Sequence, residues 1–296
     1  MNHPSTRNTL FVEQAEVVFH DAYPDGQYHM QLRSPETAKR AKPGHFIHMQ
    51  CHPSLLMRRP MSIMRADAKA GNIDILYKVH GQGTGLLSTR QKGEEIDLIG
   101  PIGQSFKLNG YKKRPLLIGG GVGIPPMVFL SEHIKNQHMD AKPFVIMGSE
   151  IPFPFETRPS QIMMKELPPD VIACMPLLED WGIASRLTSL QDYAGCFQGY
   201  VTDLARHWLD ALDDDSKNEI EIFTCGPTPM LKAVSQLAKE YNLPCQVSLE
   251  EYMACAVGGC AGCTVLIETD NGPAMKRVCV DGPVFEAETV IQFQEA

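Results

Sequence analysis

Residues 116–126 read LLIGGGVGIPP, and they indicate the fold class of the middle of the chain. An apolar run passes into a glycine loop and then into a helix-like segment. The glycines, Gly119, Gly120, Gly121 and Gly123, would let a pyrophosphate approach the backbone at the helix N-terminus, where free N–H groups and the helix dipole favour anions. The loop lacks the G-x-G-x-x-G fingerprint, so a tight turn without a ligand is the alternative.

Outward from this stretch, strand-like and helix-like segments alternate. We expect strands at 115–118, 143–147, 171–175, 219–224 and 245–249, and helices at 125–137, 201–212 and 229–241. Alternation of this kind predicts an α/β domain with a doubly wound parallel sheet.

Two further positions in this domain are candidates for nucleotide binding. Cys225-Gly226-Pro227 ends a second strand before a helix, and ligands of open α/β sheets bind at the carboxyl ends of strands. We therefore expect Cys225 to form a wall of a nicotinamide site, a buried structural thiol being the alternative. Glu150 follows the second strand, where a carboxylate would accept ribose hydroxyls and favour NAD over NADP. A solvent-facing loop residue is the alternative for Glu150.

The residues before this domain follow a different sequence pattern. Short β-type runs at 9–18, 28–33, 46–51, 61–64, 73–79 and 95–99 are separated by turn residues, which predicts a closed antiparallel barrel. In the segment Arg59-Pro60-Met61-Ser62, the arginine could bind a phosphate and the serine the polar edge of a flavin ring. Gly81-Gln82-Gly83-Thr84-Gly85 is a small-residue loop able to take a pyrophosphate. For Arg59 the alternative is a surface cation, and for the loop at 81–85 it is a hairpin turn.

Four cysteines gather in a glycine-rich segment near the end of the chain. Cys255, Cys260, Cys263 and Cys279 have the spacing C-x4-C-x2-C-x15-C, which is the plant-type pattern for a [2Fe–2S] cluster. The small residues between them suit a loop that bends sharply around a cluster. A structural zinc and unligated thiols are the alternatives, although zinc sites usually combine two C-x2-C pairs.

Length and composition limit the class of protein. A chain of 296 residues and 32.9 kDa is large for one core, and we expect domains at 1–110 (barrel), 111–245 (α/β) and 246–296 (cysteine cluster). There is no apolar run of membrane-spanning length and no secretory signal, so we expect a cytoplasmic protein. A net charge of −8 argues against nucleic-acid binding. The odd count of nine cysteines argues against a disulfide framework.

The motifs, taken in order, resemble a known family. Arg59-Pro60-Met61-Ser62, the loop at 119–126 and Cys225-Gly226-Pro227 resemble the ferredoxin–NADP reductase superfamily. With the four cysteines, Ser248-Leu249-Glu250-Glu251 and the run VCVDGPVF at 278–285, the chain is similar to the electron-transfer subunits of class 1B dihydroorotate dehydrogenases. Two departures from the family pattern are conservative, namely Met61 before the serine and Cys255-Ala256-Val257-Gly258 in the cysteine loop.

The resemblance implies an FAD-binding barrel, an NAD-binding α/β domain and a [2Fe–2S] domain. The last would dock on an FMN-containing dihydroorotate dehydrogenase catalytic subunit, in a heterotetramer. It also implies that Arg59 contacts the FAD phosphates, Ser62 the isoalloxazine, residues 81–84 the pyrophosphate, and the four cysteines iron.

These cofactors together predict a converter between two-electron and one-electron chemistry. NAD(H) exchanges a hydride and an iron–sulfur cluster exchanges single electrons, whereas FAD does both. We expect electrons to pass from dihydroorotate through the partner's FMN, the cluster and FAD to NAD. The alternative is a reductase of the same build that feeds an oxygenase, a hydrogenase-type complex or a ferredoxin. A redox-sensing or scaffold protein with a structural metal is a non-enzymatic alternative.

Overall fold

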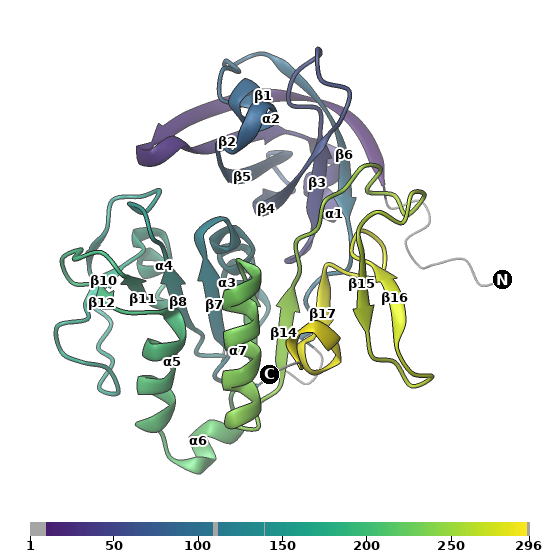
Figure 1. Ribbon diagram of the computed structural model, residues 1–296. Coiled ribbons are helices and arrows are strands. Elements are labelled where there is room, and N and C mark those ends of the chain that lie inside the picture. Colours follow the sequence, from purple (N-terminus) through teal and green to yellow (C-terminus); the bar gives the residue numbers. More distant parts are fainter. Residues whose placement is uncertain (1–9, 109–111, 139, 295–296) are drawn as a thin grey trace.

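A computed structural model describes residues 10–108, 112–138 and 140–294 of the chain. Its N-terminal part is a closed six-stranded barrel with the strand order β1-β2-β5-β4-β3-β6, at the top of Figure 1. All of its neighbouring strands are antiparallel. The strands are β1 (Phe11–Tyr23), β2 (Gln27–Arg33), β3 (Phe46–Met49), β4 (Arg59–Asp67), β5 (Asn72–Lys78) and β6 (Glu95–Ile102).

Alternating side chains explain why these strands close into a barrel. Residues two apart share a face of a strand, and pairs such as Ile73 and Ile75 on β5 are fully buried in the barrel core. Short elements fill the connections: the 3₁₀ turn η1 (Pro24–Gly26) and the helices α1 (Pro35–Arg40) and α2 (Gly81–Leu87). The predicted barrel is confirmed, with β4 extending beyond the expected 61–64; Thr9, where the first run was expected to begin, lies outside the described residues.

The second part is a seven-stranded sheet with the order β12-β11-β8-β7-β13-β14-β17. Its strands are parallel except for the last pair. The strands are β7 (Leu116–Gly120), β8 (Phe144–Gly148), β11 (Ala184–Ser189), β12 (Phe197–Gln198), β13 (Ile222–Cys225), β14 (Cys245–Ser248) and β17 (Val284–Glu286). Since the chain runs from β7 to β8 on one side and later to β13 on the other, the strand order reverses between β7 and β13.

Helices cover both faces of this sheet, because the buried strand residues alternate between two apolar clusters. Leu116 and Ile118 pack with α5 and α7 in one cluster, whereas Leu117 packs with α3 in the other. Figure 1 shows α5 and α7 together on one face. The helices are α3 (Ile124–Gln137), α4 (Pro176–Asp180), α5 (Val201–Asp210), α6 (Asp214–Asn218) and α7 (Thr228–Glu240), and the 3₁₀ turn η2 (Gly121–Gly123) precedes α3.

The C-terminal segment joins the sheet and also forms a small unit beside it. Strand β17 pairs antiparallel with β14, and β15 (Thr264–Ile267) pairs with β16 (Ala274–Arg277) in a hairpin. The 3₁₀ turns η3 (Ala287–Thr289) and η4 (Ile291–Phe293) complete the chain. Within the described residues, no helix is long and apolar enough to span a membrane.

One expected strand needs correction, and one strand of the main sheet was not predicted. The expected strand 171–175 is reduced to β10 (Ala173–Cys174), which pairs with β9 (Arg158–Pro159) outside the main sheet. The strand that does lie in the sheet, β11, was not predicted. It carries the buried Arg186, whose guanidinium donates to the carbonyls of Val171, Ser185 and Ile162 at 2.7–2.8 Å. A buried charge with each of its three nitrogens hydrogen-bonded is compatible with a central strand but gives no apolar signal.

Candidate functional site

Arg59 begins strand β4 and lies against the first turn of helix α2. Its guanidinium donates to the carbonyls of Met57 and Arg58, and a Cβ on Gly83 would come within 2.9 Å of its Nε. The close approach explains the glycine, since any side chain would displace the guanidinium. The neighbouring Arg58 is instead paired with Asp97 at 2.5 Å. Of the two neighbouring arginines, it is therefore Arg59 that lies beside Gly83.

The segment 81–84 is the start of helix α2 and not the loop that we expected. Gly81 has φ +75° and open space around it. The hydroxyl of Thr84 accepts from the N–H of His80 at 2.6 Å and donates to its carbonyl at 3.0 Å. Because these bonds close a helical first turn, the small residues form a helix start, and the Thr84 hydroxyl is already engaged.

The next residues of β4 alternate between the two faces of the barrel wall. Met61 and Ile63 pack inside the barrel, whereas Met64 packs with the cluster around α3. Ser62 shares the outer face with Met64 and is paired in register with Phe46 of β3. Pro60 is half-buried on that outer face. Ser62 is thus on the side of the barrel that meets the α/β sheet.

The turns that follow strands β7 and β13 contact each other. Gly119 is paired in register with Cys225, and a Cβ on Gly123 would lie 2.1 Å from the carbonyl oxygen of Cys225. Gly120 and Gly226 are both covered by Met230, whose atoms would lie 2.4 Å from a Cβ at either position. These glycines bring the turns together at the point where the strand order reverses. Ligands of open α/β sheets bind at such a point.

Cys225 is 1% exposed at this place. Burial raises the pKa of its thiol far above the ordinary value, with a further rise from Glu250. The thiol is therefore neutral and does not act as a thiolate nucleophile. Pro227 follows Gly226 in the exposed part of the turn, and Glu150 is exposed beyond the end of β8.

The four clustered cysteines stand as two pairs. Cys263 and Cys279 are buried, and the thiol of Cys263 donates to the sulfur of Cys279 at 3.4 Å. Cys255 and Cys260 are linked through a side-chain hydrogen bond, and Cys260 is exposed. In the described parts of the chain, no three His, Cys, Asp or Glu side chains converge closely enough for a single ion. Two pairs of thiols suit a two-iron cluster, with two thiolates for each iron, better than one tetrahedral zinc.

The loop between the cysteines directs backbone N–H groups at sulfur. Burial alone would raise the pKa of Cys255, but N–H groups of Val257, Gly259 and Cys260 lower it to about 7. The N–H of Gly262 donates to Cys260 at 3.5 Å. Ala256 and Ala261 adopt left-handed backbone conformations, with φ of +55° and +54°, which bend the loop sharply. Hydrogen bonds of this kind stabilise thiolates, so the residues present fit an iron–sulfur cluster.

Family models match the two outer parts of the chain. Residues 10–106 match the oxidoreductase FAD-binding domain, and residues 250–291 match the iron–sulfur cluster binding domain of dihydroorotate dehydrogenase B.

A relative named dihydroorotate dehydrogenase B (NAD(+)), electron transfer subunit, from Caldanaerobacter subterraneus subsp. tengcongensis, is 34% identical over 86% of this chain and 88% of its own length. The chain belongs to the family of dihydroorotate dehydrogenase B electron transfer subunits. Members from Geobacillus sp. and Bacillus cereus are 32% and 30% identical, and each is covered over 98% of its length. The resemblance predicted from the motifs is confirmed.

Solved structures agree with this assignment at the level of fold. The structure entitled "Insights into flavin-based electron bifurcation via the NADH-dependent reduced ferredoxin-NADP oxidoreductase structure" matches with a TM-score of 0.75 at 24% identity, over 94% of this chain and 90% of the other. A ferredoxin reductase in carbazole 1,9a-dioxygenase matches with a TM-score of 0.61 at 21% identity, over 79% of this chain and 67% of the other. The predicted combination of an FAD-binding barrel, an α/β region and a C-terminal iron–sulfur binding domain is confirmed.

In this electron transfer subunit, sequence reasoning missed Arg277, which braces the cysteine loop. Its guanidinium donates to the carbonyl of Gly258 at 3.1 Å and pairs with Asp281 at 3.4 Å. Arg277 thereby ties the loop with three cysteines to the turn beyond Cys279. The location of Arg277 two residues before Cys279 is a weak signal of a role near the cluster. Its contact with Gly258, however, depends on the folded loop.

His48 and Glu250 were also missed. The buried ring of His48 lies beside the backbone of Arg58 and Met253, and burial lowers its pKa to about 4, so the ring is neutral. Burial raises the pKa of Glu250, which follows β14 and adjoins Cys225. The contact of His48 with the segment before Cys255 depends on the folded chain and has no signal in the sequence.

Proposed function

We propose that this chain passes electrons between an FMN-containing dihydroorotate dehydrogenase catalytic subunit and NAD, as a step of pyrimidine biosynthesis. The names of its relatives support both the electron-transfer role and the existence of a partner subunit. The heterotetramer, the cytoplasmic location and the domain boundaries at 110/111 and 245/246 stay predictions.

The residues divide into three binding sites in this proposal. FAD supplies the exchange between hydride and single electrons, and the cluster supplies one-electron transfer. Cys255, Cys260, Cys263 and Cys279 hold the cluster. The proposed FAD site consists of Arg59, Pro60, Met61, Ser62, Gly81, Gly83 and Thr84, with Thr84 acting through its backbone. The proposed NAD site consists of Gly119, Gly120, Gly121, Gly123, Glu150, Cys225, Gly226 and Pro227.

One observation carries the proposal, namely that the barrel touches both of the other sites. Turn η2 of the glycine loop contacts barrel strand β5, and α3 packs on β4. On the other side, Gln104, two residues after β6, donates to the carbonyls of Val280 and Gly282, close to Cys279. A flavin held by the barrel would therefore lie between the nicotinamide site and the cysteines, in the order that the electron path requires.

The outer side of the cysteine loop supports docking of a partner. Ala256 is buried, but Cys260 is exposed, and Val257 is 48% exposed. Tyr252, three residues before Cys255, is 94% exposed. Apolar and aromatic side chains left open around a redox centre are typical of an interface.

The test uses the full chain, reconstituted with FAD, iron and sulfide. Cys260→Ser should abolish the cluster spectrum and the bound iron while FAD remains. Val257→Glu should block electron transfer from a reduced dihydroorotate dehydrogenase catalytic subunit and spare NADH-driven reduction of an artificial dye. Ile172→Glu, at a site 41% exposed in the α/β part, is the matched control and should leave both intact. Loss of FAD with retention of iron in Cys260→Ser would contradict the assignment of the sites.

A further inference from the structure

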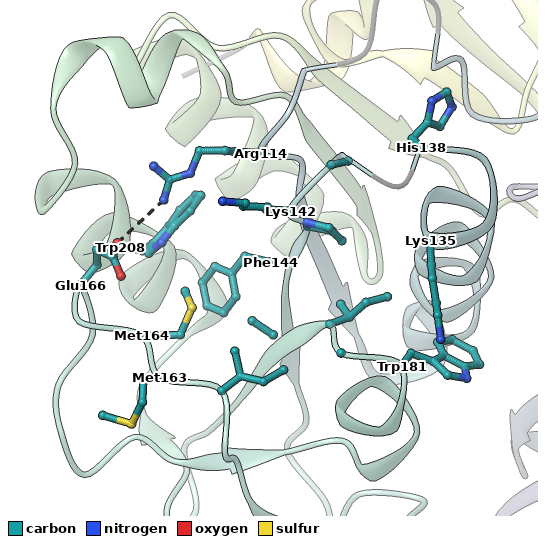
Figure 2. A pocket seen from close by; sticks show the side chains of 16 residues that line it. Arg114, Lys135, His138, Lys142, Phe144, Met163, Met164, Glu166, Trp181 and Trp208 are labelled. Carbon is teal, nitrogen blue, oxygen red and sulfur yellow. Dashed lines mark ion pairs between the residues drawn. The ribbon is translucent and has the colours of Figure 1, made fainter.

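A hollow of about 680 Å³ lies at the edge of the sheet opposite to the nucleotide motifs (Figure 2). Phe144, the first residue of β8, and Ala184, the first of β11, both line it. It therefore opens at the amino ends of the parallel strands, whereas the glycine loop and Cys225 lie at the carboxyl ends. No residue of the proposed FAD, NAD or cluster sites lines the hollow, and its volume is typical of a small-molecule site.

The hollow is positively charged although the chain as a whole is acidic. Arg114, Lys135 and Lys142 line it together with one carboxylate, that of Glu166, in a chain with net charge −8. The carboxylate is held loosely, since Arg114 and Glu166 are 3.8 Å apart and both are partly exposed. Cations gathered in a concave site attract anions more strongly than the same cations on a flat surface.

The walls beside these cations are aromatic. The chain has two tryptophans, and both line this hollow. The guanidinium of Arg114 lies 5.4 Å from the ring centre of Trp208, and the ammonium of Lys135 lies 5.8 Å from that of Trp181. Figure 2 shows Arg114 and Lys142 on the same side of the hollow, next to Trp208.

Trp208 also has a buried donor without a partner. The residue is 1% exposed, and its Nε1 makes no hydrogen bond within the described structure. Buried indole N–H groups usually have a partner. Figure 2 shows this nitrogen at the end of the ring nearest to Glu166, whose ion pair with Arg114 is long. A shift of that pair would open the donor to an acceptor atom in the hollow.

We propose that this hollow binds a small anion with a planar ring, of the class of nucleoside monophosphates. Arg114 and Lys142 would bind the phosphate, because a guanidinium and an ammonium both recognise phosphate oxygens. The apolar lining of the hollow would receive the ring, and the Trp208 N–H would donate to an acceptor atom at the edge of the ring. The site is separate from the dinucleotide site and does not depend on the proposed electron path.

Tryptophan fluorescence tests the site directly, because both fluorophores line it. The holoprotein, saturated with NAD+, is titrated with uridine 5′-monophosphate, since an adenine nucleotide would also compete for the dinucleotide site. Inorganic phosphate and uridine are titrated separately as the two halves of the probe. We expect the monophosphate to change the fluorescence saturably, and each half to bind at least about tenfold more weakly, because each lacks one set of contacts.

Lys142→Gln should weaken binding about tenfold through loss of one charge-assisted contact. Lys232→Gln, on the exposed face of α7, removes the same charge elsewhere and should leave binding unchanged. Lys142 is exposed, so its variant should fold; Arg114→Gln is the second variant, checked by its circular dichroism. The proposal is overturned if the monophosphate leaves the fluorescence unchanged, if Lys142→Gln binds like wild type, or if phosphate alone binds as tightly as the monophosphate.

Discussion

Gly123→Ala tests whether the glycine loop at 119–123 must touch the turn at 225–227. Gly123 has φ −84°, a conformation that alanine adopts without strain, so a backbone preference does not explain the glycine. Space explains it instead. A Cβ at this position would lie 2.1 Å from the carbonyl oxygen of Cys225 and 2.6 Å from the N of Gly226, whereas ordinary contact begins at 3.4 Å.

The magnitude follows from the shortfall of about 1.3 Å in that contact. The obstructing atoms are backbone, which cannot rotate away, so one turn must move by about that distance. Overpacking of a buried contact costs about 1–3 kcal/mol, and we expect about 3 kcal/mol here. A displacement of about 1 Å at a binding site can lower a rate about 100-fold. We therefore expect the kcat/KM for NADH to fall by about that factor.

Gly121→Ala is the matched control in the same loop. Gly121 has φ +54° but nothing within 4 Å of its Cβ position, so alanine should cost only about 1 kcal/mol of backbone strain. Urea unfolding gives the free energies, and NADH-dependent reduction of an artificial dye gives kcat/KM. If Gly123→Ala were no less stable than Gly121→Ala, the contact between the two turns would not be what requires the glycine.

Three further predictions concern the titration of Glu221, the contact of Arg277 with the cysteine loop, and the preference for NADH over NADPH. Burial raises the pKa of Glu221 to about 6 from 4.5, so its stabilising contribution is present below pH 4.5 and is lost as the pH rises through about 6. Above pH 6, the free energy of unfolding of Glu221→Gln should therefore exceed that of wild type by about 1 kcal/mol, a value discounted for the partial exposure of the side chain. Below pH 4.5 the two proteins should be equally stable. Urea midpoints measure the difference. Arg277→Leu removes the bond to Gly258 and should speed loss of iron in air several-fold while FAD stays bound; iron retained as in wild type would contradict this role. Glu150→Gln should raise kcat/KM for NADPH relative to NADH about tenfold, and an unchanged ratio would remove Glu150 from the ribose site.

Much of the fold could be predicted because its signals are local. The apolar runs of β7 and β13, the glycines between strand and helix, and the spacing of the four cysteines each follow from a few consecutive residues. Strand β11 could not be predicted, because Arg186 is satisfied by the carbonyls of Val171 and Ile162, which lie far along the chain.

Parts of the candidate site were hidden for the same reason. The helix at 81–87 contains three glycines, which favour turns, and the contact of Gly83 with Arg59 appears only when the barrel closes. The brace from Arg277 to Gly258 spans the hairpin of β15 and β16. Contacts of this kind depend on tertiary structure, which propensity and spacing do not encode.

In the proposed function, electrons cross this chain between a partner flavin and NAD. The most direct measurement mixes the reconstituted chain, without oxygen, with an FMN-containing dihydroorotate dehydrogenase catalytic subunit, dihydroorotate and NAD+, and follows NADH by absorbance. We predict that NADH forms only when both chains are present, and that Cys260→Ser abolishes its formation while NADH still reduces the bound FAD. Formation of NADH at the wild-type rate by a Cys260→Ser chain that lacks the cluster would show that electrons do not pass through the cluster.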